Sequence, residues 1–282
     1  MATSMTTYDQ PRSSQLANGI HTNPLPISVS LIAHNEAANL PRCLRSVAGW
    51  TSEIVVVTND CTDDTVKIAQ SFGAKTLENP WRDFQTQKNV SLDACTQPWV
   101  LALDADEEIS SALRDELIAF FNGDAPSRFH GADFPRKSWF LGRWITHGDW
   151  YPDRCLRLFR RGSGRWGGDL AHTHVIVDGP VMRLRADLHH YSYATLPAQV
   201  FKISRQSDDF LRAQLLKKKR WSLLATFFRP PWRFFRAYVL RLGFLDGFPG
   251  FYIAASTAFG ALLRYSRLYE HAHPCTPPAE KS

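Results

Sequence analysis

Short apolar runs alternate with amphipathic segments between Ile27 and Asn122. Runs of this length are typical of strands buried on both faces, and they predict strands over Ile27–Ala33, Glu53–Thr58, Ala74–Leu77 and Trp99–Leu103. The amphipathic segments predict helices near Leu40–Ala48, Asp63–Phe72, Phe84–Ala94 and Ser110–Asn122. This alternation predicts an α/β fold with a doubly wound parallel sheet that binds ligands at the carboxyl ends of its strands.

Beyond Gly131 the pattern changes to short strand-like pieces, over Arg154–Arg160, His172–Val177 and Met182–Tyr191. From Leu196 onward it predicts basic helices, with a break at Pro230 and Pro231 and a new helix after them. We therefore divide the chain into a disordered leader (1–24), an α/β catalytic domain (25–195), a helical basic and apolar extension (196–270) and a disordered tail (271–282).

Composition and charge narrow the class of protein. Hydrophobic residues make up 44% of the 282 positions, which excludes a collagen-like or fully disordered chain. The net charge is +6, and the basic excess lies between Lys202 and Arg241, with eleven basic and two acidic residues. Five cysteines without a CxxC pair argue against a disulfide framework or a thiolate zinc site, and the leader lacks the apolar core of a secretory signal. These features predict a cytoplasmic protein.

The acidic residues that end the fourth predicted strand are the strongest chemical signal. Asp104 and Asp106 lie two residues apart where a buried strand stops. Mg²⁺ and Mn²⁺ prefer a few carboxylate oxygens and leave room for substrate phosphates. A solvated acidic loop would give the same letters, but the position at a strand end favours a metal site, with Asp106 on the cation and Asp104 on ribose or the same cation.

Other candidate motifs are weaker. The polar turn Val57–Thr65 fits a nucleotide-binding loop or an ordinary turn that caps a helix. Lys88 fits a nucleotide contact or an exposed helical face. Gly162–Gly167 spells GxGxxG, but it precedes a strand pattern instead of a helix, so we exclude a dinucleotide site. His172 and His174 share a strand face and could ligate metal, whereas His189 and His190 point to opposite faces.

Together, the segments Ser30–Glu36, Glu53–Val57, Gln87–Asn89 and Leu103–Glu107 resemble glycosyltransferase family two. The segments Phe140–Trp144, Trp150–Arg161 and Arg241–Phe248 resemble, more narrowly, its lipooligosaccharide-core β-1,4-glucosyltransferase group. The similarity covers about Ile27 to Glu270. It implies a GT-A fold with a Rossmann-like, mostly parallel sheet, a divalent cation, a nucleotide-sugar donor such as UDP-glucose, inversion at the anomeric carbon and a lipid-linked saccharide acceptor.

The resemblance also implies roles for single residues. Ala33, Asn35 and Glu36 match the donor-binding strand end, Lys88 matches a basic nucleotide contact, and Asp104 and Asp106 match the DxD motif. Two positions depart from the family pattern. Thr58 stands where the family has Asp, which moves the expected base contact to Asn59 or Asp60. His172-Thr173 replaces a frequent His-Glu pair.

An inverting transfer needs a carboxylate that takes the proton of the acceptor hydroxyl. Asp153 follows the sugar-stacking surface of Trp150 and Tyr151, so we predict it as this base, with Asp149 in reserve. The alternative is an ion pair from Asp153 to Arg154 or Arg157.

Two other functions are compatible with parts of the sequence. A sugar-phosphate nucleotidyltransferase usually has a Gly-rich basic loop after its first strand, which is absent here. A non-catalytic membrane or nucleic-acid adaptor would not explain the acidic strand end.

The basic extension predicts attachment to a membrane surface. Lys217–Arg220 leads into the aromatic and apolar segment Trp221–Phe228, a pairing that favours an anionic interface. The uninterrupted apolar part, Gly250–Leu263, has 14 residues against the ~20 that cross a bilayer. We therefore expect a peripheral protein on the inner face of the cytoplasmic membrane, with an anionic lipid surface and no nucleic acid among its partners. The alternative is a helical subdomain packed on the catalytic core.

Overall fold

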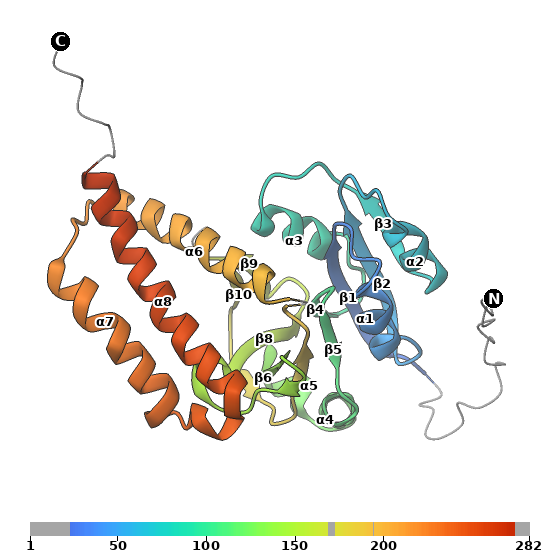
Figure 1. The fold of residues 1–282 in the computed structure, drawn as a ribbon. Helices are drawn as coiled ribbons and strands as arrows, with labels where there is room; N and C mark the ends of the chain where they lie inside the picture. Colours follow the sequence, from blue (N-terminus) through green and yellow to red (C-terminus); the bar gives the residue numbers. More distant parts are fainter. Residues whose placement is uncertain (1–22, 169–172, 194, 274–282) are drawn as a thin grey trace, which may run out of the picture.

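The computed structural model of the chain describes residues 23–168, 173–193 and 195–273 (Figure 1). Most of the predicted leader and tail, together with His172, lies outside these described residues. His271 and Ala272 still belong to the last helix, so the predicted tail boundary at 271 is two residues early.

The first half of the chain builds a parallel sheet in the order β3-β2-β1-β4. Its strands are β1 (Leu25–Ala33), β2 (Thr51–Thr58), β3 (Lys75–Glu78) and β4 (Trp99–Asp104). The helices of this half are α1 (Leu40–Val47), α2 (Thr65–Ser71), α3 (Phe84–Asp93) and α4 (Ser111–Asn122). The four strands and four helices predicted for this region are confirmed, with small differences in their bounds.

Both faces of this sheet are covered, which explains its continuous apolar strands. Leu44 of α1 and Leu117 of α4 pack against one face. Leu92 of α3 packs against the other face, together with Trp166 from a two-stranded hairpin of β9 (Gly164–Gly167) and β10 (His174–Val177). The GxGxxG segment thus leads into a strand and not into a helix. This confirms the reason for which a dinucleotide site was excluded.

The second half extends the sheet and makes it mixed. From β4 the order continues β8-β6-β12-β5, and β8 runs antiparallel to both β4 and β6. The predicted strand over Met182–Tyr191 is two strands, β11 and β12. The bounds are β5 (Glu107–Ile109), β6 (Gly131–Phe140), β7 (Arg143–Trp144), β8 (Asp153–Arg160), β11 (Val181–Arg183) and β12 (Leu188–His190), with α5 (Ala125–Arg128) and a short helix η1 (Gly148–Trp150).

Three long helices form the C-terminal part and lie beside the sheet region (Figure 1). They are α6 (Leu196–Leu216), α7 (Leu223–Phe235) and α8 (Gly247–Ala272), with the short elements η2 (Arg236–Leu240) and η3 (Gly243–Asp246) between the last two. The predicted break at Pro230 and Pro231 is wrong, because α7 continues through both residues. The fixed φ of proline suits a helix, and packing of α7 along α8 compensates for the missing backbone donors. None of the helices in the described residues is long and apolar enough to span a membrane.

A buried carboxylate joins α8 to the sheet region. Asp246 is fully buried, and its Oδ2 accepts hydrogen bonds from the backbone N–H groups of Thr146 at 3.0 Å and His147 at 2.8 Å. Within the helical region, η3 and the start of α8 pack closely around this residue, because a Cβ on Gly250 would lie 1.8 Å from the carbonyl oxygen of Gly243. The Arg241–Phe248 motif therefore fixes how the helices dock.

Replacing Asp246 with alanine should lower the free energy of unfolding by about 3 kcal/mol, because buried donors lose their charged acceptor. Urea unfolding followed by circular dichroism measures this difference. The control is Asp115→Ala, which removes an exposed aspartate of α4 and should change stability little. Equal stability of the two variants would contradict the role given to Asp246.

Candidate active site

The site begins where β4 ends. Asp104 is the last residue of β4, Asp106 lies in the tight turn that follows, and Glu107 opens β5. The parallel neighbour β1 ends beside it, with Ile32 in register with Asp104. The carboxyl ends of two adjacent strands therefore present their side chains and loops at one edge of the sheet, as predicted.

Asp104 is held by two cationic side chains. Its Oδ1 lies 2.5 Å from Lys88 Nζ, and its Oδ2 lies 2.7 Å from the Arg157 guanidinium. Burial opposes ionisation of Asp104, yet Arg157 and Lys88 together hold its pKa well below the ordinary value. Lys88 also lies over the Trp166 ring, 4.1 Å from its centroid. Lys88 thus faces the acidic strand end instead of the solvent.

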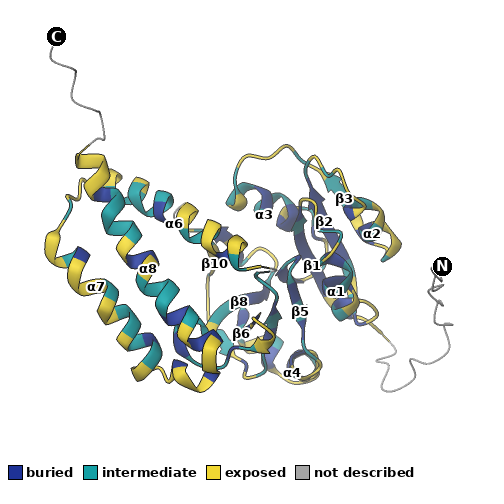
Figure 2. Cartoon of the chain, viewed as in Figure 1, coloured by how far each residue is buried: buried dark blue, intermediate teal, exposed yellow. Residues whose placement is uncertain are grey.

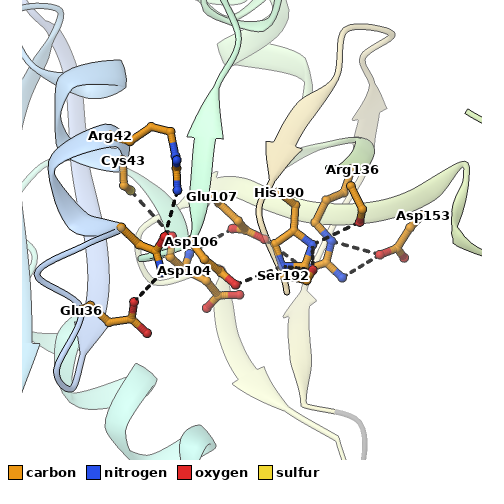
Figure 3. A network of polar contacts seen from close by, with 12 residues as sticks. Glu36, Arg42, Cys43, Asp104, Asp106, Glu107, Arg136, Asp153, His190 and Ser192 are labelled. Carbon is orange, nitrogen blue, oxygen red and sulfur yellow. Dashed lines mark hydrogen bonds and ion pairs between the residues drawn. The ribbon is translucent and has the colours of Figure 1, made fainter. Parts of the chain in front are cut away.

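Glu107 connects the charged side chains around this turn (Figure 3). Its carboxylate is fully buried and accepts three hydrogen bonds: from Asp104 N at 2.9 Å, from Arg157 at 2.6 Å and from Arg136 at 3.0 Å. Arg136 continues to Asp153, with 2.6 Å between Nη2 and Oδ2. A chain of alternating charges therefore links the turn after β4 to the first residue of β8.

Asp106 points toward His190 and Ser192 (Figure 3). Its Oδ2 lies 3.4 Å from His190 Nε2. Burial would raise the pKa of Asp106, but the hydrogen bond and charge of His190 hold it below the ordinary value. Among the described residues, no cluster of three or more histidine, cysteine or acidic side chains is arranged to hold a metal. The chemistry of the donor set is nevertheless that of Mg²⁺ or Mn²⁺, with one or two carboxylates and space for phosphate oxygens.

A cavity of about 660 Å³ lies over this edge of the sheet, within the size range of small-molecule sites. The predicted residues that line it are Ala33, Glu36, Asn59, Lys88, Asp104 and Asp106. Burial raises the pKa of Glu36 on this wall, although a hydrogen bond from Asn39 opposes the shift. The structure therefore brings most of the predicted donor and metal residues into one cavity.

Asn35 and Asp60 do not line this cavity. Both have left-handed backbone conformations, with φ of 53° and 42°. Asn35 Oδ1 accepts the backbone N–H of Thr62 at 2.8 Å, and the Asp60 N–H donates to Glu78 Oε1 at 3.0 Å. In this structure they shape the loops that carry Glu36 and Asn59.

The same cavity is lined by residues that the sequence did not assign to the donor or metal site. Arg136 and His190 come from β6 and β12, and α6 adds Lys202 and Arg205. Spacing of three residues on a helix places Lys202 and Arg205 on one face, which was a usable signal. Arg136 and His190 had no local signal, because only sheet pairing brings them to Asp106 and Glu107. Two exposed rings, Trp81 and Phe84, also line the cavity, with centroids 4.8 Å apart.

The two candidate bases lie in different places. Asp153 has a 48% exposed side chain and lines a cavity of about 580 Å³ that includes Lys88 and Asp104. Its ion-pair partner is Arg136, so the predicted pairing with Arg154 or Arg157 is wrong. Arg154 pairs with Asp133 instead. Arg157 pairs with Asp104 and Glu107.

Asp149 has an 8% exposed side chain and pairs with Arg233, Arg236 and Arg241. It lines another cavity, which includes neither Asp104 nor Asp106. The structure therefore brings Asp153, and not Asp149, beside the acidic strand end.

A family model described as glycosyl transferase family 2 matches residues 28–188. The lipopolysaccharide core biosynthesis glycosyltransferase LpsC of Rhizobium meliloti is similar to this chain, at 31% identity over 90% of this chain and 96% of LpsC. A glycosyltransferase of Rickettsia typhi, described as uncharacterized, is 29% identical over 86% of this chain and 87% of its own.

Among solved structures, TarS of S. aureus in complex with UDP-GlcNAc matches with 13% identity and a TM-score of 0.46, covering 84% of this chain and 81% of that chain. A longer TarS chain is covered over 39% of its length, with a TM-score of 0.42 and 14% identity. The family match spans more than half of the sequence, and the similarity to LpsC extends over nearly all of it. The chain therefore belongs to glycosyltransferase family 2, with a GT-A fold followed by a helical region.

Proposed function

We propose that this enzyme is an inverting, metal-dependent hexosyltransferase that moves glucose from UDP-glucose to a lipid-linked saccharide such as the lipopolysaccharide core. The observation that carries the proposal is the carboxylate pair Asp104 and Asp106 at the end of β4, inside a cavity of about 660 Å³ that is also lined by four basic residues. The similarity to LpsC, a glycosyltransferase of lipopolysaccharide core biosynthesis, supports the proposed class of acceptor.

The donor half of the cavity suits a nucleotide diphosphate and a cation. Asp106 would hold Mg²⁺ or Mn²⁺, which neutralises charge on a departing diphosphate. Lys88 keeps Asp104 charged and oriented, so Asp104 can accept from a ribose hydroxyl or share the cation. Lys202 and Arg205 of α6 would bind phosphate oxygens. Asn59 and the exposed rings of Trp81 and Phe84 would contact the nucleotide base of the donor.

Asp153 would be the base that deprotonates the acceptor hydroxyl. Inversion by single displacement needs a carboxylate on the side of the sugar away from the diphosphate. Asp153 lies across Arg136 from the acidic turn, and its partly exposed carboxylate is accessible to an acceptor. Arg136 donates to Glu107 with Nη1 and to Asp153 with Nε and Nη2, so it positions Asp153 relative to the acidic strand end.

An apolar face on the helical region supports attachment to a lipid surface. This apolar face consists of exposed side chains of α7, the short helices after it and the start of α8: Leu223, Leu224, Phe227, Phe228, Trp232, Phe235, Leu240, Phe244, Leu245 and Phe248. Figure 2 shows how much of α7 is exposed. A concentration of exposed apolar side chains is typical of a membrane or protein contact, and the exposed basic segment Lys217–Arg220 precedes these residues in the chain.

The opposite face of α7 packs against α8, and Ile253 of α8 packs on Phe140 and Ile145 of the sheet region. The helices are thus a packed subdomain as well as the proposed peripheral attachment, which would lie on the inner face of the cytoplasmic membrane. Arg233 and Arg236 pair with Asp149, so apolar contact and Lys217–Arg220 carry the proposed lipid binding.

Asp106→Asn should lower kcat by about two or more orders of magnitude, the effect of losing one major charge-stabilising contact, and leave thermal unfolding nearly unchanged. Excess chelator should abolish activity, and Mg²⁺ or Mn²⁺ should restore it. Release of UDP in the presence of acceptor measures both effects. The control, Asp93→Asn, alters an exposed carboxylate at the end of α3. Full activity of Asp106→Asn, or of the chelated enzyme, would remove the metal assignment.

Asp153→Asn should reduce kcat by roughly 10²–10⁴-fold, the usual contribution of a general base, while donor affinity and the melting temperature stay close to those of the parent enzyme. Single-turnover kinetics and calorimetric titration with UDP separate these quantities. Asp187→Asn provides a matched change at a nearby ion-paired carboxylate and should retain activity. Normal turnover of Asp153→Asn, or weakened donor binding with unchanged turnover, would assign the base elsewhere.

The protein should float with anionic vesicles, and replacing Phe227 and Phe228 with serine should reduce binding by roughly 10²–10³-fold, since each fully buried ring contributes roughly 2 kcal/mol. Ile176→Ser, at an exposed apolar residue of β10, should bind normally. High salt should weaken binding in part, through Lys217–Arg220. Parent protein that stays unbound at low salt would exclude surface attachment, and resistance to alkaline carbonate would indicate insertion.

A further inference from the structure

A second cavity, of about 350 Å³, lies among α6, α7, α8 and η1, outside the proposed donor site. Four arginines line it: Arg229, Arg233, Arg236 and Arg264. The first three are spaced four and three residues apart, so they project from one face of α7 and its continuation, and Arg264 comes from α8. We call this space the arginine cavity.

The positive charge of the arginine cavity is not balanced by the protein. Asp149 is the acidic residue among its lining residues. It binds Arg236 at 2.8 Å and lies 3.6 Å from Arg233. Within the described part of the chain, Arg229 and Arg264 have no carboxylate within ion-pair distance; Arg229 lies over the Tyr265 ring instead, at 5.4 Å. The cavity is therefore lined by four guanidinium groups and one carboxylate, which pairs with two of them and with Arg241 outside the cavity lining.

Burial and repulsion make this arrangement costly without a ligand. Burial lowers the pKa of Arg264, and the nearby charge of Arg233 lowers it further. One donor in the cavity wall, Arg236 Nε, is buried without a hydrogen-bond partner, although buried polar groups are normally paired. An anion that accepts hydrogen bonds from the arginines would relieve the repulsion and supply an acceptor for Arg236.

We propose that the arginine cavity binds a phosphate monoester or a free phosphate ion. Guanidinium groups match phosphate oxygens with paired hydrogen bonds, and a dianion offsets most of the excess charge. Thr257 of α8 adds a hydroxyl group to the same wall. The volume of about 350 Å³ accommodates a phosphate group together with part of the molecule that carries it.

The position of the cavity connects it to the acceptor. Tyr193 lines both the arginine cavity and a neighbouring cavity that contains Asp106 and Trp139. A phosphorylated acceptor can therefore reach the reaction edge on one side of Tyr193 and place its phosphate among the arginines on the other. This use of the site rests on the proposed function, whereas phosphate binding itself does not.

Titration of the full-length protein with inorganic phosphate, at ionic strength held constant with chloride, tests the site. Phosphate should raise the melting temperature in proportion to its binding. Arg264→Gln should weaken calorimetric phosphate affinity tenfold or more. Without phosphate, this variant should melt at the same or a higher temperature, because the repulsion from Arg233 is removed. A merely structural arginine would instead give a lower melting temperature.

Two further variants keep the test decisive. Arg229→Gln changes an arginine at the exposed end of the cavity and should also weaken phosphate binding if Arg264→Gln does not fold. Arg212→Gln removes the same charge from an exposed position on α6 that does not line the cavity, and should bind normally. Equal phosphate affinity in all variants, or a phosphate effect no larger than that of chloride, overturns the proposal.

The source of the phosphate is distinguished by two other probes. Tighter Arg264-dependent binding of glucose 6-phosphate than of inorganic phosphate identifies a phosphorylated saccharide. Arg264-dependent preference for vesicles with phosphatidic acid over phosphatidylglycerol identifies a lipid headgroup. Response to inorganic phosphate alone identifies the free ion. Each result supports the shared chemistry, and none depends on transferase activity, so failure of the site is separable from failure of the proposed reaction.

Discussion

The geometry of the site depends on the hydrogen bonds and ion pairs that the buried carboxylate of Glu107 makes. This carboxylate fixes the turn after β4 through the backbone of Asp104 and holds Arg157 and Arg136 from two other strands. Removing it would leave the buried Arg157 guanidinium with Asp104 alone and Arg136 with the half-exposed Asp153 alone, and loss of one partner from a buried ion pair is strongly destabilising. The acidic turn and the strands that face it are therefore one charged unit, and the orientation of each catalytic candidate depends on all the others.

Much of the first half of the fold was predictable, because its strands are buried on both faces and their sequences are continuously apolar. The strand β6 was not, although it is the longest in the sheet. It contains Pro135, Arg136 and Lys137 in succession, so its periodicity resembles a loop, and pairing with β8 and β12 makes it a strand. Pro230 and Pro231 gave the opposite error, since helix packing outweighed a strong local signal.

The residues of the site also fall into two groups, those that the sequence indicates and those that it does not. Asp104, Asp106 and Lys88 were identifiable because their chemistry is concentrated next to a strand end or on a helix that faces it. Arg157 was not, because an arginine in an alternating strand has the same appearance whether it faces solvent or a buried carboxylate. His190 was considered only for metal binding with its neighbour, and pairing of β12 with β5 and β6 carries it to Asp106 instead.

Because α6 contributes side chains to the cavity, the sheet region and the C-terminal helices cannot be separated without changing the site. The sheet region holds the acidic turn, but Lys202 and Arg205 reach the same cavity from the first helix beyond residue 195. That helix is in turn packed on α8, which Asp246 ties to the loop after β7. The helices are consequently more than a membrane attachment that could be exchanged without affecting the cavity. Given the proposed binding of the donor by Lys202 and Arg205, a chimera that exchanges these helices for those of a relative would alter the affinity for the donor together with any change in acceptor.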